Sequence, residues 1–207
     1  MIHPDTRLGH SSDVIGLGVF ATRPIRKGTV VWALDDLDQR LSPVRVRRMG
    51  PRYRALLDRY AFFNSAGESV VCWDLGRFVN HGCNANAIST GWDFDVAVRD
   101  IEPGEEICND YGALNLEESF DCHCGSPICR GTVHPDDFER YADVWDAKVR
   151  EAFAQVTRVA QPLWEFVSPK RLVAAAARDP RRVPSIRRHR LLVMPEPLRP
   201  AVAVRGS

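Results

Sequence analysis

The chain of 207 residues is long enough for one well-formed hydrophobic core, alone or with a smaller appendage. Its 44% hydrophobic content is ordinary for a globular protein, and no stretch approaches the ~18 apolar residues that a membrane span needs. The first 13 residues lack the basic start and apolar run of a secretory signal. We therefore expect an intracellular protein, either cytoplasmic or nuclear or nucleoid-associated, with no membrane association.

The net charge of +1 hides two parts of opposite sign. Residues 168–207 contain 10 Lys and Arg against 2 Asp and Glu, about +8, which leaves about −7 for residues 1–167. An acidic body favours basic protein partners through long-range attraction. The basic segment is suited to nucleic acid, to an acidic partner or to the body itself.

The first half of the chain alternates strand and helix patterns. Residues 14–34 are rich in β-branched and aromatic side chains divided by glycine, which predicts two short strands. Residues 42–60 predict a helix with proline in its first turn and a break at Gly50. The runs 60–64 and 68–74 then predict a pair of strands joined by a turn.

The second half ends in helix and tail. Residues 95–107 alternate apolar and polar side chains before a Pro-Gly turn, which predicts a strand. Residues 134–167 repeat apolar side chains every three or four positions, which predicts an amphipathic helix capped by Asp136 or Asp137. Residues 180–207 are dominated by Pro and Arg and are expected to be extended or flexible.

Three of the six cysteines lie close together, at Cys122, Cys124 and Cys129. In a reducing compartment, thiolates gathered on a tight loop indicate a structural zinc site, which needs four ligands. Free thiols in a loop are the alternative interpretation. The candidates for the fourth ligand are Cys72, Cys83 and Cys108. Spacing alone does not choose among them.

Three further segments carry polar or glycine-rich patterns. "IGLGVFA" (15–21) contains Gly-x-Gly, which permits close approach of a ligand to the backbone. "RFVNHGCNAN" (77–86) gathers Asn, His and Cys, and alone it also fits a polar turn with one buried histidine. "EPGEEICNDYGALN" (102–115) contains Asp-Tyr-Gly after a predicted strand. Each segment alone is weak evidence of function.

The order and spacing of these four segments strongly resemble the SET-domain family of protein lysine methyltransferases with its post-SET zinc motif, over residues 8–132. The resemblance implies a mainly β (α+β) fold, with small curved sheets in a β-clip-like arrangement and a knot-like active-site core. It implies a SET domain at 8–116 and a post-SET zinc segment at 117–132. The sequence adds a helical extension at 133–179 and a basic tail at 180–207.

The resemblance also implies the cofactor and the catalytic group. S-adenosylmethionine would be held by backbone and side-chain atoms of the following residues: Gly16, Leu17, Gly18, Asn80, His81 and Tyr111. Tyr111 matches the tyrosine that faces the methyl group and the target amine, and is the expected catalytic residue.

The channel for the substrate lysine is implied at Tyr60, Asn109 and Phe120. Structural Zn²⁺ would be bound by a set in which the cysteine of the Asn-His-x-Cys motif completes the site: Cys83, Cys122, Cys124 and Cys129. This leaves Cys72 and Cys108, which we expect to be buried apolar residues.

The sequence departs from the family at Asn109, where members usually carry Phe or Tyr and where the side chain limits how many methyl groups fit. The smaller asparagine suggests the hypothesis of a roomier pocket that permits di- or trimethylation. Gly82 and Ala85 replace the usual Ser and Pro, and both changes are small.

The expected activity is methyl transfer from S-adenosylmethionine to the ε-amine of lysine in a histone or another basic protein. Two alternatives belong to other classes. One is a catalytically inactive, zinc-stabilised binding module of the same fold. The other is a nucleic-acid-associated protein that acts through its basic tail. The helix expected within 134–167 is favoured to pack on the core, with a homodimer or partner surface as the alternative.

Overall fold

The computed structural model describes residues 1–192. Its strands are β1 (Thr6–Ser12), β2 (Gly16–Ala21), β3 (Val30–Ala33), β4 (Gln39–Leu41), β5 (Ala61–Phe63), β6 (Ser69–Val71), β7 (Asn80–His81), β8 (Ala87–Ser89), β9 (Phe94–Ala97), β10 (Cys108–Asn109), β11 (Phe120–Asp121) and β12 (Thr132–Val133). Its α-helices are α1 (Pro43–Arg47), α2 (Pro51–Tyr60), α3 (Asp137–Phe153) and α4 (Lys170–Arg178). Short 3₁₀ turns are η1 (Leu75–Phe78), η2 (Tyr111–Ala113), η3 (Pro180–Arg182) and η4 (Ile186–His189).

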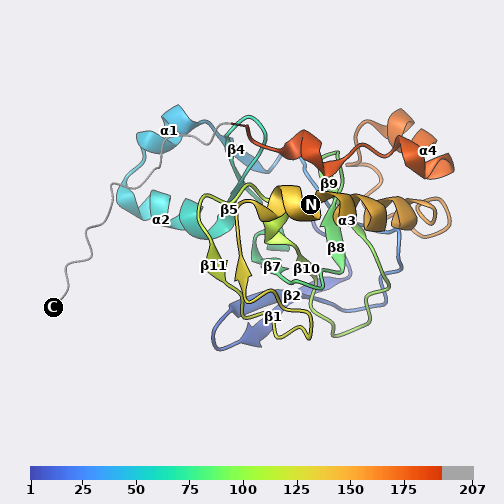
Figure 1. The fold of residues 1–207 in the computed structure, drawn as a ribbon, viewed down its shortest axis with the longest axis horizontal. Coiled ribbons are helices and arrows are strands. Elements are labelled where there is room, and N and C mark those ends of the chain that lie inside the picture. The colour runs from blue at the N-terminus through green and yellow to red at the C-terminus, as the bar shows by residue number, and fades with distance from the viewer. Residues whose placement is uncertain (193–207) are drawn as a thin grey trace.

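The strands form several small sheets rather than one large one. Two sheets have three antiparallel strands, in the orders β3-β9-β8 and β4-β6-β5, and the hairpins β1-β2 and β11-β12 are also antiparallel. The pair β7-β10 is parallel. In Figure 1 these sheets lie between α1 and α2 on one side and α3 and α4 on the other. The small-sheet architecture with C-terminal helices confirms the predicted fold class.

The predictions for residues 42–71 are confirmed in detail. The Ser42 hydroxyl accepts a hydrogen bond from the N–H of Arg45, and helix α1 begins with proline. A second helix begins after Gly50, so the predicted break separates α1 from α2. Strands β5 and β6 pair antiparallel, and the turn between them places Gly67 at φ +74°, a conformation that favours glycine.

The main core is formed where α3 packs against the β3-β9-β8 sheet. Its large members are Phe94, Phe138, Trp145 and Phe153, all buried. The amphipathic helix is therefore confirmed, and its apolar face packs within the chain, although it ends at residue 153 rather than continuing to 167. Asp136 occupies the N-cap position, as predicted, but its side chain makes no capping hydrogen bond; the Asp137 carboxylate instead accepts from the N–H of His134 at 3.2 Å. No helix within residues 1–192 combines the length and apolar character required to cross a bilayer.

The segment 180–192 corrects the prediction of an extended or flexible tail, because it packs on the body of the molecule. The N–H of Ile186 donates to the Asp146 carboxylate of α3 at 2.9 Å, and Arg187 forms an ion pair with Asp143 at 2.7 Å. Three apolar side chains of the segment are buried: Val183, Ile186 and Leu191. These apolar residues, spaced among the arginines, outweigh the low overall hydrophobicity. The rest of the predicted tail lies outside the described residues.

Candidate functional site

The parallel pair β7-β10 brings two of the predicted segments together. Asn80 lies opposite Cys108, and His81 lies opposite Asn109. Directly after β10, the backbone N–H of Tyr111 donates to His81 Nδ1 at 3.1 Å. Burial lowers the pKa of His81, although the nearby Asp110 carboxylate opposes this, so the neutral ring accepts that bond. The backbone of the Asp-Tyr-Gly segment is therefore fixed to the Asn-His segment.

Tyr111 lies in a fixed orientation at the centre of this arrangement. Its hydroxyl donates to the Val79 carbonyl at 2.6 Å, and its ring packs against those of His81 and Phe120. The Asp110 carboxylate caps the turn η2 by accepting from the N–H of Gly112. Burial raises the pKa of Tyr111 above its ordinary value, so the phenol stays protonated near neutral pH.

The Gly-x-Gly hairpin is fastened to Asn80 by a side-chain network. The Asn80 amide donates to the Leu17 carbonyl at 2.9 Å and to Glu106 at 2.7 Å. A Cβ at Gly18 would lie 2.2 Å from the Glu106 carboxylate, so a larger residue there would displace the Glu106 side chain. At Gly16, with φ +89°, no heavy atom lies within 4 Å of the position of a Cβ. The backbone there is open to a ligand. Sequence reasoning missed Glu106, and its place in the Gly-Glu-Glu run was the signal.

A cavity of about 690 Å³ adjoins some of the predicted site residues. It is lined by all the residues predicted for the substrate channel, Tyr60, Asn109 and Phe120, and by Tyr111. The residues predicted to hold the cofactor do not line it: Gly16, Leu17, Gly18, Asn80 and His81. Tyr111 borders the cavity and also contacts His81, so it belongs to both groups.

One end of this cavity carries a buried polar cluster that the sequence did not predict. The Asn109 amide donates to Asp95 Oδ2 at 2.6 Å and to the Ser89 hydroxyl at 3.1 Å. Asp95 belongs to the central strand β9, where its alternation with apolar residues is typical of a solvent-facing position. Burial raises the pKa of Asp95 to about 6, although hydrogen bonds from Ser89 and Asn109 lower it in part.

Because the pKa of Asp95 is raised, the free energy of unfolding should depend on pH. Asp95→Asn should remove this dependence. Protonated Asp95 stabilises the fold fully below pH 3.8, and this contribution is lost as pH rises through about 6. Ionisation in the folded state therefore costs about 3 kcal/mol at pH 8. Urea unfolding should show the variant gaining about this much free energy of unfolding, relative to the native chain, between pH 4 and pH 8. A constant difference across this range would contradict the prediction, and exposed Asp93→Asn is the control.

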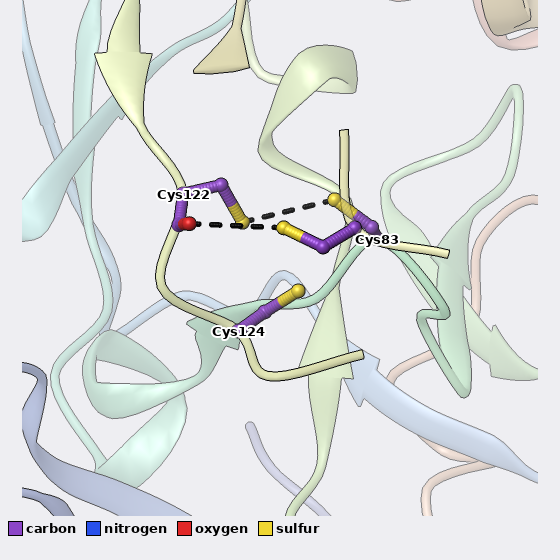
Figure 2. A group of neighbouring side chains, drawn as sticks. Cys83, Cys122 and Cys124 are labelled. Atoms are coloured by element: carbon purple, nitrogen blue, oxygen red, sulfur yellow. Dashed lines mark hydrogen bonds between the residues drawn. The ribbon is translucent and has the colours of Figure 1, made fainter. Parts of the chain in front are cut away.

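The four cysteines of the predicted metal set meet in one cluster, of which Figure 2 labels Cys83, Cys122 and Cys124. All four sulfur atoms lie within 4.8 Å of one another, and those of Cys83 and Cys122 are 3.7 Å apart. Backbone N–H groups of Arg130 and Gly131 each donate to a cluster sulfur at 3.4 Å. The other cysteines, Cys72 and Cys108, do not belong to the cluster. Cys72 is buried as expected, whereas Cys108 is only partly buried.

Arg130 joins the cysteine segment to the Tyr111 loop and to α3. Its guanidinium contacts the Asp110 carboxylate at 2.6 Å and the Asp137 carboxylate at 3.3 Å, and lies 4.7 Å from the ring centre of Tyr141. The Trp145 indole donates to the second Asp110 oxygen at 3.2 Å. Sequence reasoning missed this cluster, because its members come from three separate segments and no motif marks their pairing.

Arg130→Leu is expected to lower the free energy of unfolding by about 3–5 kcal/mol, because it removes the arginine that pairs with the buried Asp110 carboxylate and one of the two arginines that pair with Asp137. Denaturant unfolding at neutral pH measures this change. Arg26→Leu is the control, since Arg26 pairs with Asp100 at the surface and its loss should have a much smaller effect. Equal effects of the two substitutions would contradict a special role for Arg130.

Comparison with known proteins gives a family match that includes the Gly-x-Gly, Asn-His and Asp-Tyr-Gly motifs and ends before the clustered cysteines of residues 122–129. The model of the SET domain matches residues 16–112. Histone-lysine N-methyltransferase ATX2 of Arabidopsis thaliana is 28% identical over 140 residues, which are 62% of this chain and 13% of the relative. A histone-lysine N-methyltransferase of Candida albicans, H3 lysine-36 specific, is 28% identical over 133 residues, 57% of this chain and 15% of the relative.

Two further comparisons are a shorter match and a solved structure. Histone-lysine N-methyltransferase ASHR3 of Arabidopsis thaliana is 34% identical over 89 residues, 39% of this chain and 18% of the relative. The chain thus spans less than a fifth of the length of these three relatives. Among solved structures, the methyltransferase domain of human histone-lysine N-methyltransferase SETMAR aligns with a TM-score of 0.45 and 19% identity, covering 64% of this chain and 58% of that one.

Proposed function

Because the chain belongs to the SET-domain family of lysine methyltransferases, we propose that it transfers methyl groups from S-adenosylmethionine to the ε-amine of a lysine in a protein substrate. The observation that carries the proposal is the position of Tyr111. Its ring contacts the Asn-His segment, where the cofactor is expected, and it also borders the cavity that holds all the predicted channel residues. One side chain thus adjoins both reactants.

The proposed role of the chain's residues is to orient the reactants, rather than to supply an acid or a catalytic metal. S-adenosylmethionine, when bound, supplies an electrophilic methyl group on a positively charged sulfur. Tyr111 donates its hydroxyl proton to Val79, and its oxygen keeps lone pairs that can accept a hydrogen bond from the substrate amine. A neutral amine, whose proton has been lost to solvent, would thereby be aligned in line with the methyl group that the bound cofactor would supply.

The hairpin β1-β2 and Asn80 are the proposed cofactor site. The open backbone at Gly16 fits a ligand that is held through main-chain atoms. Asn80 and Glu106 fix the position of that backbone through the Leu17 carbonyl and through the Ser11 hydroxyl, which donates to Glu106 at 2.6 Å. The site is proposed for the methionine and adenine parts of S-adenosylmethionine.

The cysteine cluster is proposed to hold one structural Zn²⁺. Four sulfur ligands suit zinc, whose tetrahedral sites have Zn–S bonds of about 2.3 Å and hence sulfur atoms about 3.8 Å apart. The observed 3.7 Å between Cys83 and Cys122 fits this spacing. The N–H groups of Arg130 and Gly131 are oriented to stabilise thiolate sulfur. The metal would hold the segment 117–132 beside Tyr111.

The proposed domains are a SET domain at 8–116, a post-SET segment at 117–132 and a helical extension at 133–179. A histone is the proposed substrate, since the relatives are named histone-lysine N-methyltransferases, and a nuclear or nucleoid-associated location follows from it. The dimer alternative is less favoured, because the apolar face of α3 packs within the chain. Nucleic-acid binding by the basic tail is also less favoured, because several arginines of segment 180–192 form ion pairs with acidic side chains of the chain: Arg181, Arg182, Arg187 and Arg190.

The function is tested by incubating the native chain with labelled S-adenosylmethionine and either purified histones or a cell lysate. Labelled protein bands support the enzyme. Calorimetry measures whether the chain binds S-adenosylmethionine. Binding without methyl transfer to any protein would indicate the inactive binding module. A folded, zinc-loaded chain that binds no S-adenosylmethionine would overturn the proposal.

Asn109→Phe is expected to shift the product towards monomethyl-lysine. The larger ring fills space beside Tyr111 that the asparagine leaves open, so a methylated amine has less room to turn for a second transfer. Mass spectrometry of the product after long incubation gives the ratio of mono-, di- and trimethylated lysine for both chains. A strictly monomethylated product from the native chain would contradict the roomier pocket.

A further inference from the structure

The cavity beside Tyr111 ends at a buried carboxylate, that of Asp95. Within residues 1–192, no ion pair within 4.0 Å joins Asp95 to a basic side chain. The positive groups that act on it from farther away are His189 of η4 and the amino group of Met1. A buried charge without a close counter-charge is costly, and such costs are typical of functional sites.

The neighbours of Asp95 orient the carboxylate without neutralising it. Asn109 donates to one oxygen, and the Ser89 hydroxyl also lies within hydrogen-bonding reach. An ionised carboxylate accepts about four hydrogen bonds, so acceptor capacity remains for a ligand. The lining of the cavity also includes Trp32, Trp92 and Phe94, and apolar surroundings of this kind strengthen a charge interaction.

We propose that Asp95 forms an ion pair with the positively charged amine of a substrate side chain that enters this cavity. That this side chain is lysine rests on the proposed function; that the ligand is a cation rests on the buried Asp95 carboxylate in the cavity lining, which elsewhere also includes Arg40, Arg59 and Arg77. Asp95 would select for a cationic side chain and retain it while the amine remains charged. Asn109 acts as a positioning residue for the carboxylate, which is a reason for a polar side chain at this position.

The test compares two neutral-backbone probes, Nα-acetyl-lysine N-methylamide and its norleucine counterpart, which differ in the amine. Their binding is followed by NMR through the indole N–H signals of Trp32 and Trp92, which line the cavity. The native chain should bind the lysine probe about tenfold or more tightly than the norleucine probe. Asp95→Asn should bind both equally, whereas Asp93→Asn, which removes a carboxylate from the exposed rim of the cavity, should keep the preference.

A second measurement uses the native chain alone. The preference for the lysine probe should be full at pH 8 and should weaken as pH falls through about 6, where Asp95 becomes protonated. The titratable groups facing Asp95 are His189, the Met1 amine and Cys72. His189→Gln should leave the pH dependence in place. A preference that persists in Asp95→Asn, or one unchanged between pH 5 and pH 8, would overturn the proposal.

The two proposals fail separately. Lysine-probe binding that depends on Asp95, without any methyl transfer, would retain the cation site and reject the enzyme. Methyl transfer at an unchanged rate and KM in Asp95→Asn would retain the enzyme and reject the cation site.

Discussion

Tyr111→Phe should reduce methyl transfer by about a hundredfold or more, because it deletes a hydroxyl that adjoins both the cavity and the proposed cofactor site. The ring remains, so packing against His81 and Phe120 is kept. The loss should appear in kcat, since the hydroxyl orients the amine in the transition state and contributes little to holding the substrate. Transfer from labelled S-adenosylmethionine to protein measures it.

Three controls make this result interpretable. Calorimetry with S-adenosylmethionine should show nearly unchanged affinity, and thermal unfolding should show a loss of only about 1–3 kcal/mol from the unpaired Val79 carbonyl. Tyr53→Phe changes the same side chain on the exposed face of α2 and should be neutral. If Tyr111→Phe kept its rate within about threefold, the hydroxyl would have no catalytic role.

Removal of the proposed zinc should have the second large effect, on folding and on methyl transfer. Cys122→Ser should abolish zinc binding and unfold the segment around residues 117–132, because metal affinity in such sites supplies about 10–16 kcal/mol of folding free energy. Elemental analysis should find one zinc per native chain and almost none in the variant. Methyl transfer should fall with the zinc content, since Arg130 would lose its position beside Asp110.

The matched control is Cys72→Ala, which removes a buried thiol outside the cluster and should keep its zinc. A chelator should lower the unfolding temperature of the native chain and of this control alike. A native chain that is purified with zinc in the buffer, yet contains none and does not respond to the chelator, would reject the metal site.

The sequence predicted the parts of the fold that depend on local pattern. The break at Gly50, the pair β5-β6 and the helix over 137–153 follow from proline, glycine and apolar spacing, which act within a few residues. Strand β1 was missed, because its residues 6–12 are largely polar and are held by pairing with β2 rather than by burial.

The sequence likewise predicted some residues of the candidate site and missed others. The four motifs predicted which segments meet, and Cys83 indeed joins the three clustered cysteines. Asp95 and Arg130 were not predicted, because their surroundings come from other segments. An acidic residue in an alternating strand is indistinguishable from a solvent-facing one until β10 places Asn109 against it. The packing of α3 brings Arg130 and Asp110 together, and sequence spacing does not reveal this contact.

The wall of the cavity has a consequence for how the chain can be divided. It includes His189 of η4, whose carbonyl accepts from Asn115 and whose ring contacts the Trp92 carbonyl at 3.1 Å. The parallel pair β7-β10 and the β1-β2 hairpin lie entirely before residue 112. A protease that cuts between α4 and η4 would therefore damage the proposed site for the methyl acceptor while sparing the proposed site for the methyl donor. Recognition of the two proposed reactants would thus be separable along the chain.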